Sequence, residues 1–208
     1  MVKHPVRKIF VEGGGNNNTA LTTECKKAFK KFLEAAGFSG RLPAVVPCGG
    51  RRCAYDQFCT AIDGLNDGDL AILLVDSEER VTSSSPWDHV KQRQGDGWDR
   101  PASASDEQLH LMVQCMEAWF LADRAALQEF FGQGFRENAL PAATAKIEEV
   151  RKTDLYQKLA AATRETKTKG EYDKGKHSFK LLELVDPALV REASPWAKRF
   201  LQALDSIL

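Results

Sequence analysis

Net charge is the first thing the sequence lacks, because 29 lysines and arginines balance 29 aspartates and glutamates among 208 residues. Without a global field, nothing draws the whole molecule onto DNA, RNA or an anionic membrane, so any nucleic-acid surface has to be local. Long apolar runs are also missing, and none approaches the roughly 20 residues that a membrane-spanning helix needs. We therefore expect no membrane span.

Cysteine and histidine are sparse and show no metal-binding spacing. The cysteines are Cys25, Cys48, Cys53, Cys59 and Cys115. Their odd number and the absence of a CxxC pair argue against a disulfide framework and a zinc ribbon. We interpret them as reduced thiols of a cytoplasmic protein. The first residues contain no apolar signal-peptide core, so we expect no secretion.

Nucleotide-binding motifs are absent as well. The stretch Gly-Gly-Gly-Asn-Asn-Asn-Thr at 13–19 lacks the Lys-Ser/Thr pair of a P-loop and the spacing of GxGxxG. No Gly-x-Ser-x-Gly elbow of a serine hydrolase occurs. The sequence therefore predicts no nucleotide cofactor.

What is present is a core-forming pattern, since 43% of the residues are hydrophobic. Short apolar or β-branched runs predict four strands, at 6–11, 42–47, 70–75 and 109–114. The third run is continuously apolar, as in a central strand covered on both faces. Helical spacing at 21–36 and 55–65 alternates with these strands. The alternation predicts an α/β fold with a mostly parallel sheet of about four strands flanked by helices.

The second half of the chain has a different pattern. Residues 83–105, rich in Ser, Gly and Asp with two tryptophans, predict a long irregular loop within 79–107. Helices are predicted at 117–131, 143–162 and 195–208. We expect residues 1–131 to form the core of the fold and residues 132–208 to form a helical C-terminal extension packed on it.

Carboxylates follow two of the predicted strands. Glu12 comes directly after the first and precedes a glycine triplet, and Asp76 and Glu78 follow the third. The carboxyl ends of parallel strands meet at one edge of a sheet, where ligands bind. In extended backbone, residues 76 and 78 point to the same side and Ser77 points away. We therefore expect three acids to converge.

Such a cluster needs a counter-charge, because each pair of carboxylates at 4 Å repels by roughly 4 kcal/mol at an effective dielectric near 20. Arg80 is the only nearby cation in the sequence. Mg²⁺ or Mn²⁺ would neutralise the acids, and the glycines after Glu12 would let backbone amides approach a phosphate. The alternative is that each acid is a helix cap or a turn residue.

At these positions the sequence resembles the Toprim fold of topoisomerases, primases, OLD-type nucleases and RloB-like defence proteins. Val11-Glu12-Gly13 resembles the glutamate that closes the first Toprim strand, and Asp76-Ser77-Glu78 is a DxE variant of the usual DxD pair. Cys115-Met116-Glu117-Ala118-Trp119-Phe120 is similar to the Glu-x-Trp segment of the RloB-like branch. The resemblance covers about residues 7–123 and is greatest to an uncharacterised bacterial family, DUF4276, often found with ATPase partners in phage defence.

The resemblance implies a metal-dependent nuclease that hydrolyses phosphodiester bonds, with RNA such as tRNA favoured over duplex DNA and an ATPase as partner. Asp76 and Glu78 would coordinate Mg²⁺ or Mn²⁺, and Glu12 would be a ligand or the general acid/base. Glu117 would complete a second metal position. The alternative is that Glu117 lies in the first turn of a helix, where the helix dipole favours an acid.

A basic segment at 164–180 interleaves cations, glycines and aromatics. Lysines bind phosphates and an aromatic ring can stack on a base. We predict phosphate contacts at Lys174, Lys176, His177 and Lys180 and base stacking at Tyr172. A charge-mixed solvated loop is the alternative.

Two other functions fit the same residues. One is a non-catalytic binding or adaptor subunit of an ATPase complex that keeps a Toprim fold. The other is a phosphatase or phosphotransferase on a similar sheet. The substrate, the number of metal ions, the oligomeric state and the identity of the partner stay open at this point.

Overall fold

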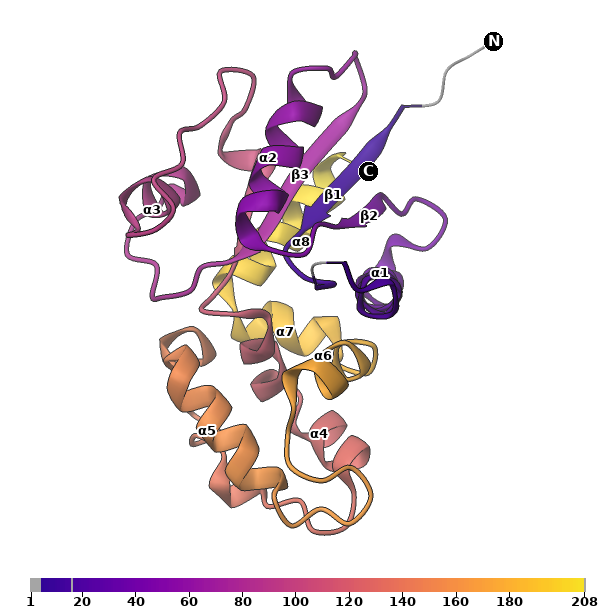
Figure 1. Ribbon diagram of the computed structural model, residues 1–208, viewed down its shortest axis with the longest axis vertical. Coiled ribbons are helices and arrows are strands. Elements are labelled where there is room, and N and C mark those ends of the chain that lie inside the picture. The colour runs from indigo at the N-terminus through magenta and orange to yellow at the C-terminus, as the bar shows by residue number, and fades with distance from the viewer. Residues whose placement is uncertain (1–4, 16, 208) are drawn as a thin grey trace.

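The computed structural model describes residues 5–15 and 17–207. Its centre is a four-stranded sheet in the order β2-β1-β3-β4, with every neighbouring pair parallel (Figure 1). The strands are β1 (Arg7–Val11), β2 (Ala44–Pro47), β3 (Leu70–Asp76) and β4 (Leu109–Met112). The predicted α/β fold with a parallel sheet is thus confirmed. The expectation about secretion depends partly on residues 1–4, which lie outside the described residues.

The sheet is covered on both faces, which explains the continuous apolar run of β3. All seven residues of β3 are buried. Ile72 and Leu74 belong to the core on one face, whereas Leu73 and Val75 belong to the core on the other. Burying each such side chain contributes about 1.5–3 kcal/mol, so β3 fixes the centre of the fold.

Helices α1 (Thr19–Leu33) and α2 (Arg51–Ile62) cover opposite faces (Figure 1). The side chain of Asn18 accepts a hydrogen bond from the Leu21 amide and begins α1, and Gly37 with φ +98° ends the turn after it. The prediction places the start of α2 at residue 55. The helix begins earlier, directly after Gly50, so that Arg51 lies at the carboxyl edge of the sheet.

The long irregular loop predicted at 83–105 contains a helix, α3 (Pro86–Gln92). Proline at the first helical position after Ser85 is a typical helix start, and the Ser- and Gly-rich flanks hide it in the sequence. Trp87 and Trp98 are both buried against the sheet face that α2 covers. The segment is therefore packed structure around a short helix.

The chain after β4 is helical, with boundaries that differ from the predicted ones. The helices are α4 (Arg124–Phe131), α5 (Lys152–Thr163), α6 (Lys174–Leu182), α7 (Pro187–Ala193) and α8 (Pro195–Ile207). The helix predicted at 117–131 is divided at Asp123 into a 3₁₀ segment and α4. The helix predicted from 143 begins at 152, and α6 and α7 are helices that the sequence did not predict.

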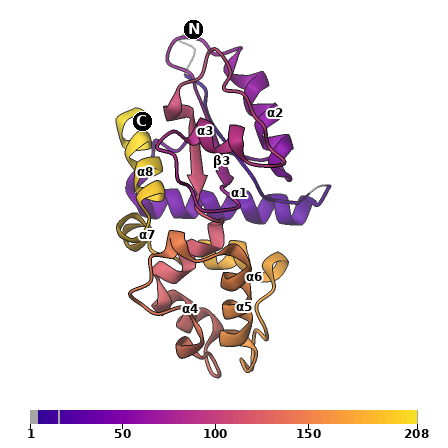
Figure 2. The same ribbon diagram turned by 90° about the vertical axis from the view of Figure 1, so that its left-hand side faces the viewer.

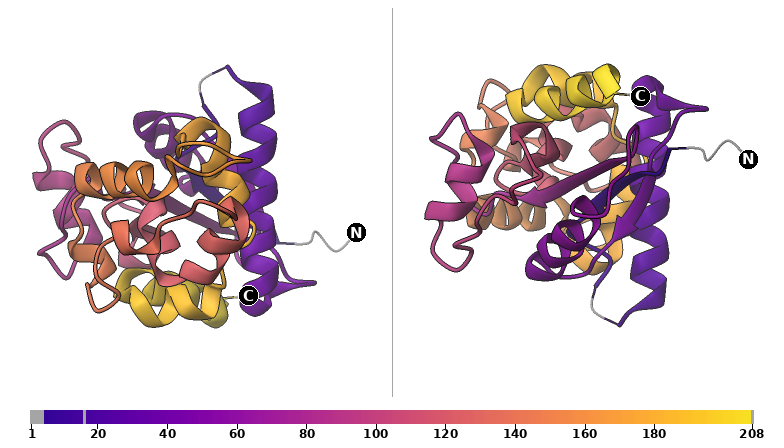
Figure 3. Two further views of the ribbon diagram at one scale, coloured as in Figure 1. Left: turned by 90° about the horizontal axis from the view of Figure 1, so that it is seen from below. Right: turned by 90° about the horizontal axis from the view of Figure 1, so that it is seen from above.

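These helices form a layer beyond the carboxyl ends of the strands. Helices α4, α5 and α6 lie together below the sheet in Figures 1 and 2, and they cover its end when seen from below (Figure 3). Helix α8 returns to pack beside β4. One hydrophobic core contains both Ile72 of the sheet and Leu155 and Leu159 of α5. Within the described ranges, no helix has the length and apolarity to cross a bilayer.

His110 of β4 is a buried polar group that links α8 to the sheet. Its Nε2 donates to the Glu107 carbonyl at 3.0 Å, and its Nδ1 accepts from Arg199 Nη1 at 3.0 Å. Accepting from a guanidinium requires a neutral ring. Burial and the Arg199 charge lower the pKa of His110 to about 3.

This histidine makes stability depend on pH. Between its ordinary pKa near 6.5 and about 3, the unfolded chain binds a proton that the folded chain does not, so stability falls as pH falls, by about 1.4 kcal/mol per unit. From pH 7 to pH 5, we expect the wild type to lose about 2 kcal/mol more than His110→Gln does in urea unfolding. Equal pH slopes for the two proteins would contradict a neutral buried His110.

Candidate metal centre

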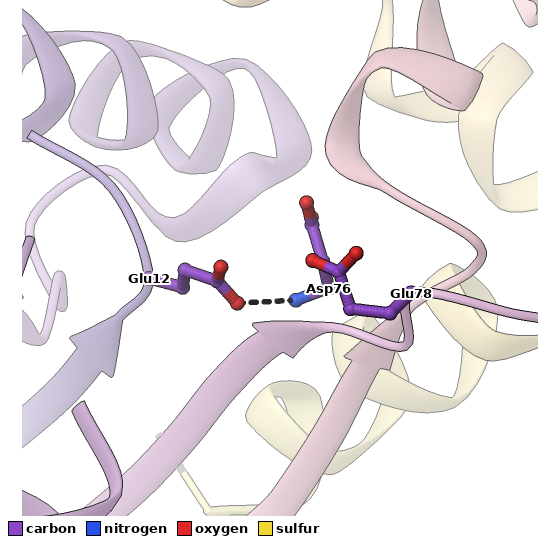
Figure 4. A group of neighbouring side chains, drawn as sticks. All are labelled: Glu12, Asp76 and Glu78. Atoms are coloured by element: carbon purple, nitrogen blue, oxygen red, sulfur yellow. Dashed lines mark hydrogen bonds between the residues drawn. The ribbon is translucent and has the colours of Figure 1, made fainter. Parts of the chain in front are cut away.

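Three acids meet at the carboxyl edge of the sheet (Figure 4). Glu12 follows β1 and Asp76 ends the neighbouring strand β3. The Asp76 amide donates to Glu12 Oε2 at 3.2 Å. One carboxylate oxygen from each of Glu12, Asp76 and Glu78 lies within 4.8 Å of the others. The sequence predicts this convergence, and the structure forms it.

Glu78 reaches the cluster from a turn, so the prediction that residues 76–78 are extended is wrong. The strand stops at Asp76, and Glu78 has a left-handed backbone with φ +67°. The Glu78 amide donates to the Gln114 carbonyl at 2.8 Å. A non-glycine residue in this conformation costs about 1–3 kcal/mol, and such strain gathers at functional sites. A tight turn therefore aims the third acid, where an extended strand was expected.

Two cations that are distant in the sequence contact the acids. Lys152 of α5 places Nζ 3.2 Å from Asp76 Oδ2 and 2.7 Å from Glu78 Oε1. Arg51 of α2 places Nη1 3.5 Å from Glu12 Oε2 and donates to the Asp76 backbone carbonyl. The expectation that Arg80 is the only nearby cation is wrong, because packing brings residues from other elements to the same edge. Arg80 itself pairs with Glu149 at the surface.

Arg51 is held rigidly by the segment that was expected to be a loop. Its Nε and Nη2 donate to the two oxygens of Asp96 at 2.9 and 2.6 Å. The guanidinium lies 4.7 Å from the ring centre of Trp98, which in turn stacks on Tyr55 at 4.6 Å. A bidentate pair together with a cation–π contact fixes the orientation of the guanidinium. Arg51 is therefore a preorganised cation beside Glu12.

Burial and nearby negative charge make Glu12 and Asp76 reluctant to ionise. Burial is the main cause that raises the pKa of Glu12 to about 7, and the negative charge of Asp76 is the second. Burial and the negative charge of Glu117 raise the pKa of Asp76. Burial opposes the charge of Lys152, but Asp76 and Glu78 outweigh it and raise the pKa of that ammonium. The two cations therefore compensate the acids only in part.

Glu117 lies outside the group of three. Its carboxylate is fully buried and accepts from the hydroxyls of Tyr156 and Ser178, each at 3.0 Å. Lys174 pairs with it at 3.2 Å. Burial opposes ionisation, but Lys174 and these hydrogen bonds lower the pKa of Glu117. Its three partners join Glu117 to α5 and α6, and the second metal position that the resemblance implies stays a prediction.

Comparison with known proteins places the chain in one family. The family described as Domain of unknown function (DUF4276) matches residues 11–205. The chain belongs to the DUF4276 family. No curated protein and no solved structure matches it. The match runs through both the sheet and the helical layer of this DUF4276 protein, and the family description names no activity.

Two residues of the basic segment that were predicted to contact nucleic acid, Tyr172 and His177, are buried. His177 of α6 is buried against the rings of Phe130 and Phe131, and its Nδ1 accepts from the Asp173 amide at 3.0 Å. The Tyr172 hydroxyl is hydrogen-bonded within the core. The predictions of a phosphate contact at His177 and of stacking at Tyr172 are therefore wrong.

The lysines of α6 differ from these two residues. Lys174 pairs with Glu117 but keeps 56% of its side chain exposed. Lys176 and Lys180 are exposed on the same helix. Their phosphate contacts stay a prediction. Helical periodicity explains the division, since α6 turns residues 177 and 178 inward and leaves 176 and 180 outward.

A cavity of about 280 Å³ adjoins the acids. Its lining combines Glu12 and Asp76 with the glycine loop 13–15 and the start of α6. Gly14 has φ +89°, and a Cβ there would lie 3.0 Å from Pro47 Cβ and 3.1 Å from Thr22 Cα. Only glycine therefore allows the loop to pack this tightly beside the cavity.

Sequence reasoning misses Arg51 and Lys152. Arg51 follows Gly49-Gly50 at the end of β2, so the rule that selects Glu12 and Asp76, position after a parallel strand, could have selected it too. Lys152 has no comparable signal, because it begins a helix that reaches the acids only through tertiary packing.

The lysine supplies a test of whether the acids bind a cation. Lys152→Met removes the ammonium that Asp76 and Glu78 share, and we expect a loss of about 1–3 kcal/mol of stability, because the lysine is 22% exposed and partly screened. Added Mn²⁺ should then raise Tm by more than in the wild type, since the ion replaces the lost charge. Lys158→Met, exposed on the same helix, is the control in thermal melts. An equal Mn²⁺ response in all three proteins would contradict a metal site here.

Proposed function

We propose that this DUF4276 protein is a metal-dependent nuclease that hydrolyses phosphodiester bonds, with Glu12, Asp76 and Glu78 holding Mg²⁺ or Mn²⁺. One observation carries the proposal: the three carboxylates lie within 4.8 Å of one another at the ligand-binding edge of a parallel sheet. The residues fit such an ion. All three donors are carboxylate oxygens, the ligand type that Mg²⁺ and Mn²⁺ prefer.

The charges of the cluster support the same reading. Three carboxylates face two cations, and Arg51 is shared with Asp96. When all three are ionised, as metal binding would require, the three acids and two cations together carry one negative charge. A divalent ion together with one phosphodiester, which carries a single negative charge, brings the formal sum to zero.

The chain's own residues have distinct roles in this proposal. When bound, the ion would neutralise phosphate charge and favour ionisation of an attacking water. Glu12 Oε2 is fixed by the Asp76 amide, whereas Oε1 has no hydrogen bond within the described residues and can accept a proton from water. Arg51, held by Asp96, keeps Glu12 in place. Lys152, which contacts Asp76 and Glu78, would donate to an oxygen of a phosphate held beside them.

No excess positive charge is available on this chain to bind a nucleic acid. Net charge is zero, and the exposed Lys176 and Lys180 form a local positive surface on α6. Because the net charge is zero, we expect this chain by itself to be attracted only weakly to long duplex DNA. A structured RNA such as tRNA, with an ATPase partner supplying further contacts in a cytoplasmic defence system, fits these charges better.

Removal of single carboxyl charges tests the activity. Asp76→Asn and Glu12→Gln should each lower Mn²⁺-dependent cleavage of RNA by at least about 100-fold, because each removes a ligand or proton acceptor. Glu79→Gln is the matched control, since Glu79 adjoins Glu78 in the chain and its side chain is 61% exposed. Thermal melts check that the variants fold. Wild-type cleavage that persists in EDTA would exclude the proposed mechanism.

An adaptor without catalysis is the second candidate, and the ion pairs favour it. Lys152 and Arg51 already contact the acids, as they would in a purely structural cluster. In that case calorimetry should detect no heat of Mn²⁺ binding in the wild type, and Asp76→Asn should change nothing. A heat of Mn²⁺ binding that is present in the wild type and absent in Asp76→Asn would instead support the metal site.

A further inference from the structure

The cavity beside the acids has the size of a small ligand. Its volume is about 280 Å³, just below the roughly 300 Å³ at which pockets for drug-sized molecules begin. It lies between the glycine loop and the first turns of α6. A base with its sugar fits such a space, and a base pair does not.

The lining combines charged side chains with apolar ones. Glu12 and Asp76 form part of it, and Lys174 adds a positive charge. The apolar surface comes from Leu21, Met116 and Phe179. A nucleotide has the same division, because its base presents a flat apolar face while its phosphate is charged and polar. Apolar and aromatic walls bind bases of any sequence.

The acids are recessed. Asp76 is 5% exposed as a residue, and the side chain of Glu12 is 20% exposed. A phosphodiester in the backbone of a continuous duplex is held at the surface of a wide, stiff cylinder. A single strand or a displaced nucleotide can bend its backbone inward, at a cost of a few kcal/mol when it has to leave a duplex. The geometry therefore favours unpaired nucleic acid.

We propose that this cavity receives one unpaired nucleotide of the substrate and so directs the phosphodiester next to it onto the acids. The proposal rests on the proposed nuclease function and adds its substrate class, single-stranded or locally unpaired nucleic acid. No base identity is selected, since the walls that face the base are apolar.

Gly175 offers a way to fill the cavity without touching the acids. It lines the cavity in the first turn of α6, and a Cβ there would meet only Asp173 Oδ1, at 3.4 Å. Its backbone is not left-handed, so Gly175→Leu adds an isobutyl group in a helix that gains propensity. Gly64→Leu, at an exposed glycine with an equally open Cβ position after α2, is the matched control.

The experiment compares a short labelled RNA as a single strand and annealed to its complement, with MnCl₂, for the wild type and both variants. We expect cleavage of the single strand, resistance of the duplex, and at least about a tenfold loss in Gly175→Leu, as for a lost base-stacking contact. The Mn²⁺-induced rise in Tm should persist in Gly175→Leu. Equal cleavage by Gly175→Leu and the wild type, or equal cleavage of duplex and single strand, would overturn the subsite and leave the nuclease standing.

Binding of AMP separates the two proposals if no RNA is cut. AMP that raises the Tm of the wild type and of Gly64→Leu, but not of Gly175→Leu, would support the nucleotide subsite while the nuclease function fails. Absence of any AMP effect on an uncleaving wild type would overturn both.

Discussion

The hydrogen bond from the Asp76 amide to the Glu12 carboxylate is the contact on which the candidate site depends. It follows from the parallel register of β1 and β3, in which Val11 lies opposite Leu74. That register brings two acids to one edge without any loop having to close over them. Like charges at this distance repel, so every other feature of the site has to supply positive charge or hydrogen-bond donors.

The compensation comes from all parts of the chain and joins its layers. Arg51 from α2 and Lys152 from α5 contact the acids, and Lys174 from α6 contacts Glu117 beneath them. The site therefore lies at the boundary between the sheet and the helical layer. The family match over residues 11–205 covers both layers, in agreement with a core that runs without a break from β3 to α5.

Local patterns explain which parts of this structure the sequence predicts. The apolar run of β3 indicates burial on both faces, and turns after β1 and β3 indicate where the acids lie. Predictions are wrong where a local pattern has two readings. The cations and aromatics of the basic segment suggest a surface, yet α6 has one face against the core, which takes His177 inside. The Ser-rich flanks of α3 conceal a proline-initiated helix that fixes Trp87 and Trp98.

The sequence by itself determined the α/β fold, the central strand and the meeting of Glu12 with Asp76, because each follows from burial and strand polarity within short segments. Tertiary structure alone decided the counter-charges. Lys152 and Glu78 are 74 positions apart, and Arg51 and Glu12 are 39 apart. It also decided the turn at Glu78 and the placement of Glu117 among partners from α5 and α6. Contacts across such separations depend on how helices pack against the sheet, and no periodicity within one segment records that packing.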